Sequence, residues 1–481
     1  MSSNWPLVKL SDLISVKHGF AFKGEFFSDT STNAVLVTPG NFAIGGGFKA
    51  DKLKFYNGPI PTEYKLKAGD LVVTMTDLSK QADTLGYSAL IPNHPERLYL
   101  HNQRIGLIEI DSQDIDKFYL YFLMRSREYR HHVVSSATGS TVKHTSPSKI
   151  ASFEFRLPPL ETQKSIGQKL IRLEEKASVN HQINQTLEQM AQAIFKSWFV
   201  DFEPVKAKIA ALEAGGSEED ALLAAMQAIS GKGEEELTRL QAEQPEQYTE
   251  LRATAELFPS AMQDSELGEI PEGWSALPLY DTAEYVNGAA FKAKDFSESG
   301  SGLPIIKIAE LKQGISAGTK YTNAEVKDKY RITDGSVLYS WSGSPETSLE
   351  VFKWFGGEGW LNQHIFKLNF TKGQSEHFTY FLLKQMKPLL VRTAQQKQTT
   401  GLGHITVADM KRIKIPYPSS ELLSAFSENI EPLYSRSSNT VRESKTLADL
   451  RDTLLPKLLS GELSATGAEP HTLEAVEIAN V

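Results

Sequence analysis

The sequence predicts an α+β protein in which one mixed α/β domain occurs twice and each copy is followed by a long helix. Two phrases, KHGFAFK at Lys17–Lys23 and NGAAFK at Asn287–Lys292, nearly repeat one another, and the match continues on both sides of them. HNQRI at 101–105 aligns with LNQHI at 361–365, an offset of 260 residues. Solenoid repeats have periods of roughly 20–50 residues, so this much longer repeat indicates a duplicated domain.

Boundaries follow from composition and from the spacing of apolar residues. Pro158–Pro159 precedes the first long helical pattern, and Gly461 closes the second, as expected for a helix start and a helix stop. The predicted segments are a first mixed domain (1–158), a first long helix (159–204), an acidic helical insert or linker (205–272), a second mixed domain (273–420), a second long helix (421–463) and a flexible tail (464–481).

Charge follows the same division. The chain carries a formal net charge of −8, yet residues 1–158 hold 18 Lys and Arg against 15 Asp and Glu, and residues 273–420 hold 18 against 13. The acidic excess lies in 159–272 and 421–481. Two basic domains of the same build indicate contact with a polyanion, so nucleic acid is the expected partner.

Composition excludes several classes of protein. A hydrophobic content of 40% and a charged content of 23% are ordinary for a soluble globular chain. The absence of cysteine excludes disulfides and thiolate metal sites. The first residues do not resemble a secretory leader, and no apolar run reaches the roughly 18 residues of a membrane span. We therefore expect a cytoplasmic protein with no membrane partner.

The two long segments have the spacing of helices that pack on another helix. Apolar residues recur at three- and four-residue steps from Ile166 to Trp198, and again from Phe426 to Leu458. Asn180 and Asn184 interrupt the first seam, which is a common way of fixing register. The two helices are therefore expected to pair with each other.

Apolar residues also occur off this seam. They are Phe195, Phe199 and Phe202 on the first helix, and Leu455 and Leu459 on the second. Such a stripe either packs on the helix's own domain or forms a docking face for another subunit, since two paired helices cannot bury a second stripe. We assign these five residues to partner binding.

Catalytic motifs give no consistent picture. FGGEG at 355–359 fits the glycine-rich loop of adenine methyltransferases, but the loop that would hold a flipped base has no counterpart. Asp295, Glu310 and Lys312 loosely imitate a nuclease site. No phosphate-binding loop or metal-ligand spacing is found. We therefore predict no catalytic residue and no bound metal.

Three stretches resemble the specificity subunits of Type I restriction–modification systems. They are AQAIFKSWFVDFEP (191–204), LFPSAMQDSELGEIPEGW (257–274) and RDTLLPKLLSGEL (451–463). The resemblance implies two target recognition domains separated by two long helices that pair as an antiparallel coiled coil. It also implies a non-catalytic subunit that binds double-stranded DNA and reads a bipartite, asymmetric site, with one half-site per domain. The insert within 205–258 fits the family least well.

The same resemblance implies the partners and their cofactors. Two modification subunits would methylate adenine with S-adenosylmethionine, and restriction subunits would use ATP and Mg²⁺ to cleave. No cofactor is expected on this chain itself.

Base-reading residues are expected where the two copies diverge, on polar loops beside predicted strands, because Asn, Gln, Arg and Lys can pair with base edges in the major groove. Asn102–Gln103 and Asn362–Gln363 occur in both copies, which favours a structural or phosphate-positioning role. The candidates in the first domain are Lys80, Gln81, Arg104, Thr138, Ser140, Lys143 and His144. The candidates in the second domain are Trp341, Ser342, Ser344, His364, Gln396, Lys397, Gln398, Thr399 and His404.

Two other classes remain open on the sequence alone. A stand-alone DNA methyltransferase or nuclease would need the catalytic motifs that are missing here. A coiled-coil DNA-binding scaffold would not need two large basic domains with divergent loops. Co-purification discriminates among them, because a specificity subunit should carry modification subunits and should neither methylate nor cut alone.

Overall fold

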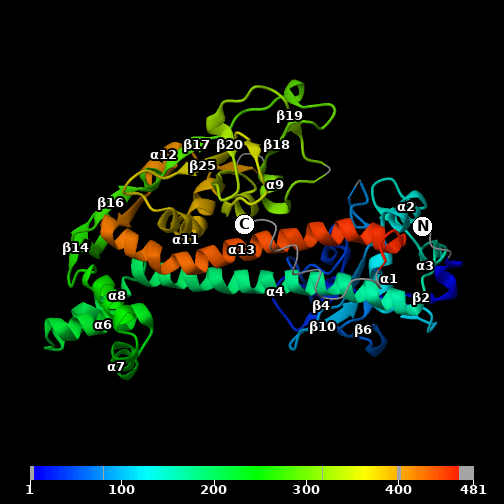
Figure 1. The fold of residues 1–481 in the computed structure, drawn as a ribbon, viewed down its shortest axis with the longest axis horizontal. Coiled ribbons are helices and arrows are strands. Elements are labelled where there is room, and N and C mark those ends of the chain that lie inside the picture. Colours follow the sequence, from blue (N-terminus) through cyan, green and yellow to red (C-terminus); the bar gives the residue numbers. More distant parts are fainter. Residues whose placement is uncertain (1–4, 80, 317, 398–401, 465–481) are drawn as a thin grey trace. The chain divides into compact units, whose positions relative to one another are not determined.

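A computed structural model describes residues 5–79, 81–316, 318–397 and 402–464 (Figure 1). The chain divides into two compact units, one of Met1–Val179 with Ser444–Val481 and one of Asn180–Glu443. Each unit holds one mixed α/β domain and parts of two 40-residue helices, α4 (Leu160–Phe199) and α13 (Ser420–Leu459). No helix among the described residues is long and apolar enough to cross a bilayer. The predicted tail at 464–481 lies, but for its first residue, outside the described residues.

The first unit contains two principal sheets. The first is antiparallel, in the order β2-β11-β7-β9, and the second has the order β3-β5-β4-β10-β6, in which β4 and β10 run parallel. The strands of the first sheet are β2 (Ile14–His18), β7 (Leu71–Thr74), β9 (Ser88–Leu90) and β11 (Ile105–Ile110). Those of the second are β3 (Phe27–Ser28), β4 (Ala34–Val37), β5 (Lys54–Tyr56), β6 (Lys65–Leu66) and β10 (Leu98–His101).

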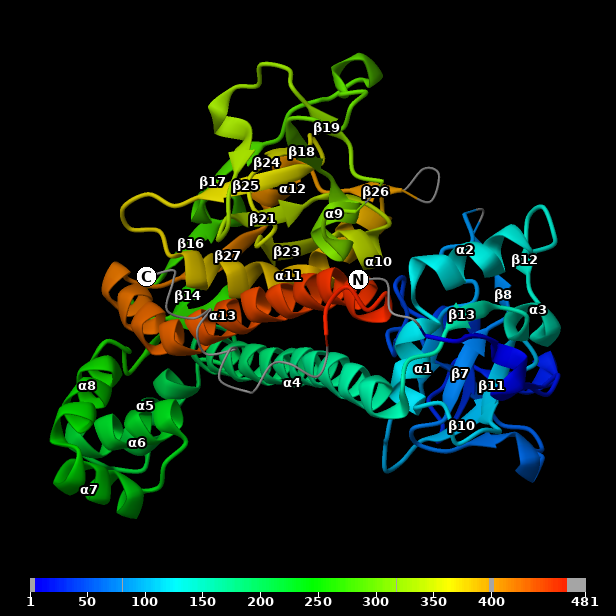
Figure 2. The ribbon, with the colours of Figure 1, turned by 45° about the vertical axis from the view of Figure 1, so that its right-hand side comes forward.

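The second unit repeats this topology, except that its second sheet has no counterpart of β3 among the described residues. Most of its strands are labelled in Figure 2. Its antiparallel sheet has the order β17-β25-β21-β23, and its other sheet, β19-β18-β24-β20, again has one parallel pair, β18 with β24. The predicted duplication is therefore confirmed at the level of strand order. These strands are β17 (Glu284–Asn287), β18 (Leu303–Ile306), β19 (Tyr321–Thr322), β20 (Arg331–Ile332), β21 (Val337–Ser340), β23 (Glu350–Lys353), β24 (Gly359–Leu361) and β25 (Ile365–Asn369).

The repeated phrase that opens each copy has a steric reason. A Cβ atom on Gly19 would lie 2.2 Å from the backbone oxygen of Asn102, and one on Gly288 would lie 2.2 Å from that of Asn362. In each copy, the residue after this glycine forms a parallel bridge with that asparagine. Only glycine permits so close an approach of two backbones, so the phrase and the Asn-Gln pair recur together.

Helices α4 and α13 run antiparallel within each unit. In the second unit, Asn180 Nδ2 donates to Glu443 Oε2 at 2.7 Å, and Asn184 Oδ1 accepts from Thr440 Oγ1. A higher residue number on α4 is thus matched by a lower one on α13, as expected for antiparallel helices. In the first unit Glu174 Oε1 lies 2.9 Å from Arg451 Nη1, and the colours of Figure 1 show that α4 and α13 run in opposite directions there as well. The paired antiparallel helices of the predicted fold are thus present.

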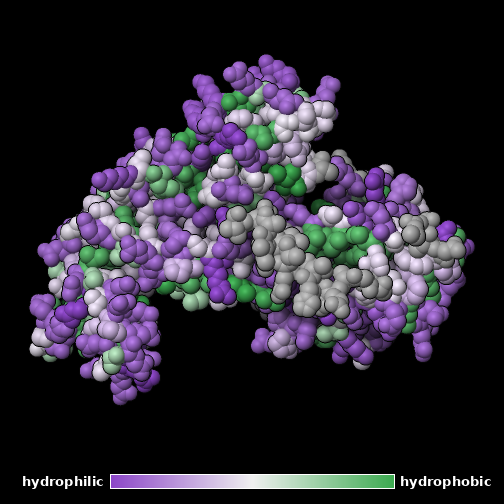
Figure 3. All heavy atoms as spheres, in the orientation of Figure 1, coloured by the Kyte–Doolittle hydropathy of each residue, from purple (hydrophilic) through white to green (hydrophobic). Residues whose placement is uncertain are grey.

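The acidic insert folds into a small helical cluster. Its helices are α5 (Glu203–Glu213), α6 (Glu218–Ser230), α7 (Glu234–Glu243) and α8 (Pro245–Glu256), followed by the hairpin of β14 (Met262–Ser265) and β15 (Gly268–Pro271). Leu222, Met226 and Leu237 lie in its core. The exposed face of α6–α8 is mostly hydrophilic at the lower left of Figure 3. Helices α6, α7 and α8 therefore pack around one small apolar centre, whereas Val205 of α5 belongs to the larger core of the second unit.

The aromatic residues at the end of α4 are not a docking face, and neither is Phe202, which lies beyond α4 at the start of α5. Phe195, Phe199 and Phe202 are only 1%, 4% and 9% exposed. Phe199 stacks edge-on against Phe378 and Phe426 at ring-centroid distances of 5.1 and 4.9 Å.

On α13, Leu455 is buried and Leu459 is half-buried, and both lie in the core of the first unit. The prediction that this stripe binds another subunit is therefore wrong for the three aromatic residues and for Leu455. Each domain covers the face of its neighbouring helix, which the periodicity of the helix could not reveal.

Candidate nucleic-acid interface

A two-stranded sheet in the first domain begins directly after strand β7. It pairs β8 (Thr76–Asp77) with β12 (Lys143–His144), placing Lys143 opposite Asp77 and His144 opposite Thr76. The Oγ1 atom of Thr76 lies 3.1 Å from Nδ1 of His144. Backbone hydrogen bonds of 2.9 Å in both directions tie Thr138 to His144. Three predicted residues, Thr138, Lys143 and His144, are thus brought together.

The loop that follows β8 is held closed by one buried carboxylate. Asp77 is 4% exposed and accepts hydrogen bonds from Ser79 N at 2.6 Å and from Thr84 Oγ1 at 2.8 Å. Burial by itself would raise the pKa of Asp77, but these hydrogen bonds outweigh it and hold that pKa below its usual value. The loop therefore presents Gln81 at an exposed position. Lys80 lies outside the described residues.

Arg104 lies beside this small sheet. Its backbone oxygen accepts from Met75 N at 2.9 Å, and its backbone N–H donates to Asn102 Oδ1 at 3.1 Å. The exposed Arg104 lines a hollow of about 430 Å³ together with Lys54 and Gln103. Asn102 thus shapes the turn that carries Arg104, consistent with a structural role. Ser140 lies apart on the exposed end of the 138–144 loop.

The second domain carries an equivalent sheet in which β22 (Ser342–Gly343) pairs with β26 (Gly403–His404), with Ser342 opposite His404. Trp341 precedes it, and its ring lies 5.7 Å from that of His364. The Trp341 Nε1–H donates to Asn287 Oδ1 at 3.1 Å, which fixes the indole. Trp341, Ser342, His364 and His404 therefore form one exposed or half-exposed group.

The two small sheets occupy equivalent places. His144 and His404 are separated by the repeat offset of 260 residues, and so are Arg104 and His364. All four side chains are exposed. One histidine position is therefore shared by the two copies, whereas the neighbouring position is arginine in one and histidine in the other.

Several predicted residues of the second domain do not join this group. Lys397 Nζ contacts both carboxylate oxygens of Asp409, at 2.5 and 2.6 Å, so its charge is already neutralised. Burial alone would raise the pKa of Asp409, but hydrogen bonds from Lys397 and Thr406 dominate and lower it to about 2. Lys397 is thus paired within its own domain while staying exposed, and its contact with DNA stays a prediction.

The remaining candidates lie at separate places. Gln396 is exposed at the end of α11 (Glu376–Gln395), and Ser344 is exposed where α10 (Pro345–Ser348) begins. Gln398 and Thr399 lie outside the described residues.

Two apolar side chains at the sheets escaped the sequence search. Leu78, which follows Asp77, is 64% exposed, and Leu402, which precedes β26, is 60% exposed. An exposed apolar side chain can contact the thymine methyl group in the major groove. The sequence analysis missed these residues because it nominated side chains that can hydrogen-bond to base edges. An isolated leucine within a polar loop was the signal that could have found them.

The nuclease-like and methyltransferase-like motifs have structural roles. Glu310 is buried and accepts from Lys307 N at 3.0 Å and from Thr319 Oγ1 at 3.1 Å. Within FGGEG, the backbone oxygen of Gly357 accepts from Trp354 Nε1 at 2.6 Å. Among the described residues, no group of three or more His, Asp or Glu side chains could hold a metal ion.

Residues 2–189 and 271–429 match the family described as the Type I restriction modification DNA specificity domain. These ranges make up more than half of the chain, and the chain belongs to this family. Most of the helical insert lies between the two matched ranges.

The chain is also similar to individual proteins of known name. The chain is 31% identical over 406 residues to the Type I restriction enzyme HindI specificity subunit of Haemophilus influenzae, covering 80% of this chain and 87% of that protein. It is 22% identical over 353 residues to the MjaIX specificity subunit of Methanocaldococcus jannaschii, covering 72% and 68%. A crystal structure of a Type I restriction–modification S subunit from M. genitalium aligns with a TM-score of 0.46 at 14% identity, over 95% of this chain and 96% of that one.

Proposed function

We propose that this chain is the DNA-specificity subunit of a Type I restriction–modification enzyme and that each mixed domain reads one half of a bipartite, asymmetric site. One observation carries the proposal. The two domains share strand order and the glycine–asparagine contact, yet they present different side chains at equivalent exposed positions, Arg104 in one and His364 in the other. Shared backbone with divergent surface residues suits two readers of different half-sites.

The chemistry then belongs to partner subunits. Two modification subunits would methylate adenine with S-adenosylmethionine, and restriction subunits would cleave with ATP and Mg²⁺. This chain would contribute DNA binding and the choice of site. Such a role implies a location in the cytoplasm, where the cell's DNA is found.

A domain exchange tests the proposal. Residues 1–158 are replaced by the matching domain of a relative, the chain is co-expressed with its modification subunits, and methylated adenines in host DNA are mapped. One half of the recognised site should change while the other stays the same. A change in both halves would contradict independent reading. Methylation by the purified chain alone would favour a stand-alone methyltransferase instead.

A further inference from the structure

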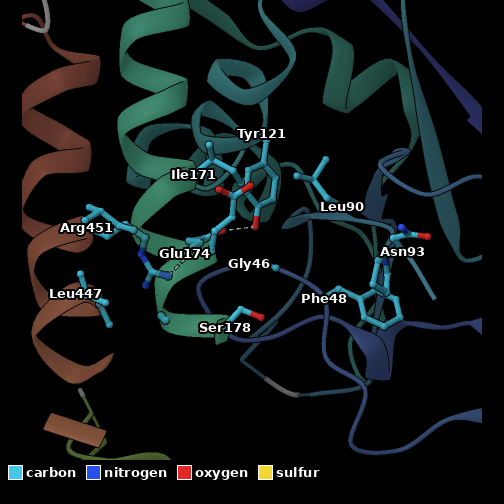
Figure 4. Close-up of a pocket in the computed structure, with 16 residues that line it drawn as sticks. Gly46, Phe48, Leu90, Asn93, Tyr121, Ile171, Glu174, Ser178, Leu447 and Arg451 are labelled. Atoms are coloured by element: carbon cyan, nitrogen blue, oxygen red, sulfur yellow. Dashed lines mark hydrogen bonds and ion pairs between the residues drawn. The ribbon is translucent and has the colours of Figure 1, made fainter. Parts of the chain in front are cut away.

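A hollow of about 550 Å³ lies within the first unit, between the recognition domain and the helices (Figure 4). Glu174 of α4 lines this hollow, and its side chain points toward Tyr121 of α1 (Lys117–Leu123). Arg451 of α13 approaches Glu174 from the other side. The Glu174 carboxylate accepts from Arg125 Nη1 at 2.6 Å, from Tyr121 OH at 2.8 Å and from Arg451 Nη1 at 2.9 Å. One carboxylate thus joins the domain to both helices.

Arg125 extends the connection toward the antiparallel sheet β2-β11-β7-β9 of the first domain. Its Nε–H donates to the backbone oxygen of Gly45 at 2.6 Å. Gly46 has a φ of +90°, and a Cβ atom there would lie 2.5 Å from Arg125 Nε, so the loop fits closely over the guanidinium. Gly47 N in turn donates to Ser88 O of β9 at 2.9 Å. Polar contacts, joined by the backbone of Gly45–Gly47, therefore connect α13 to the antiparallel sheet of the first domain at β9.

The second unit fills the equivalent place with different chemistry. At the repeat offset, Glu174 corresponds to Tyr434, Arg451 to Ala191 and Tyr121 to Phe381. The rings of Phe381 and Tyr434 lie 6.3 Å apart, and both side chains are buried.

The polar contacts of Tyr434 and of Lys384 in the second unit use two separate carboxylates. Tyr434 OH donates to Glu376 Oε1 at 3.1 Å, and Lys384 pairs with Glu188. In the first unit, by contrast, three donors converge on Glu174. Hydrogen bonds that converge on one carboxylate fix direction as well as distance.

Burial makes the ionic joint sensitive to the loss of one charge. The Arg125 side chain is 2% exposed, and Glu174 and Arg451 are 20% and 21% exposed. Removing the shared carboxylate would leave a buried guanidinium without its counter-charge, which is far more costly than losing a surface ion pair.

We infer that Glu174 is a positioning residue that fixes the first recognition domain on its helices, and that it thereby restricts the gap accepted between the two half-sites. This inference rests on the proposed function. Glu174 does not contact the hollow lined by Arg104, so its loss should leave the reading of each half-site intact. Loss of Glu174 should instead make the complex more tolerant of sites whose half-sites are separated by a longer or shorter gap.

The test compares full-length Glu174→Gln with wild type, each assembled with its modification subunits. The probes are duplexes carrying the mapped site with its native gap, or with a gap one base pair longer or shorter. The preference for the native gap is the ratio of the affinities for the native duplex and for a duplex with an altered gap. In Glu174→Gln this ratio should fall about tenfold, a size typical of coupling between two sites. Discrimination against substituted half-site bases should not change. The matched control is Glu175→Gln, an exposed neighbour that lines the same hollow.

Other outcomes would contradict either the inference about Glu174 or the proposed function. Preserved gap preference in Glu174→Gln, or an equal loss of affinity for all duplexes, would overturn the inference. If Glu174→Gln does not fold, Arg451→Gln replaces it, because that variant keeps the Arg125–Glu174 pair and should show a smaller loss of gap preference. A wild-type complex that prefers no mapped sequence would remove the proposed function itself.

Discussion

The two recognition domains contact their helices through different side chains on a shared backbone frame. Both contacts have an apolar core. The first unit adds one carboxylate, Glu174, that is shared by two arginines. At the equivalent place the second unit packs Tyr434 near Phe381, and Lys384 pairs with Glu188 of α4. The backbone frame is nevertheless the same, down to the glycine that touches Asn102 or Asn362. Duplication has thus preserved geometry while the side chains at each joint diverged with their own partners.

The largest expected effect lies in the aromatic contact. Phe199→Asp places a carboxylate among buried rings and should destabilise the second unit by about 4 kcal/mol or more, because it combines lost packing with a buried charge. Chemical denaturation of the full-length chain measures this loss. Val200→Asp, at a neighbouring residue 38% exposed, is the control and should change little. A stable Phe199→Asp protein that fails to bind modification subunits would restore the docking interpretation.

An intermediate effect is expected at the reading surfaces. Arg104→Ala should weaken binding by about 1–3 kcal/mol and relax base preference in one half-site only, since a good side-chain-to-base contact is worth that much. His364→Ala should do the same for the other half-site. Competition binding with singly substituted duplexes separates the two. If both variants relaxed the same half-site, assignment of one domain to each half would be wrong.

The smallest effect concerns pH and again distinguishes the domains. Asp409 has a folded-state pKa of about 2 against an ordinary value of 3.8. Because the folded value is the lower one, its ionisation stabilises the fold above about pH 4, and this contribution is lost as the pH falls toward 2.

Asp409→Asn should therefore flatten the dependence of unfolding free energy on pH across that window. The first domain has Lys149 at the equivalent position, so Lys149→Met should leave this acid dependence unchanged. An identical acid profile for Asp409→Asn and wild type would contradict the ion-pair explanation.

The sequence by itself determined the duplication and the two long helices, whereas the residues that it nominates for base reading stay a prediction. Repetition of Gly19 with Asn102 identified shared scaffold because a close backbone approach tolerates only glycine. The three- and four-residue apolar spacing identified α4 and α13 because such spacing places those residues on one helical face. It also placed Asn180 and Asn184 toward the partner helix, where they bond Glu443 and Thr440.

Only the tertiary structure decided what covers each surface. The periodicity of α4 showed that Phe195 and Phe199 share a face but not that Phe378 and Phe426 bury it. Nothing in the local sequence of Lys397 indicated that folding would pair it with Asp409. The joint at Glu174 draws on residues from 45 to 451, and such long-range pairing leaves no local pattern, because each side chain is defined only by the partner that folding brings to it.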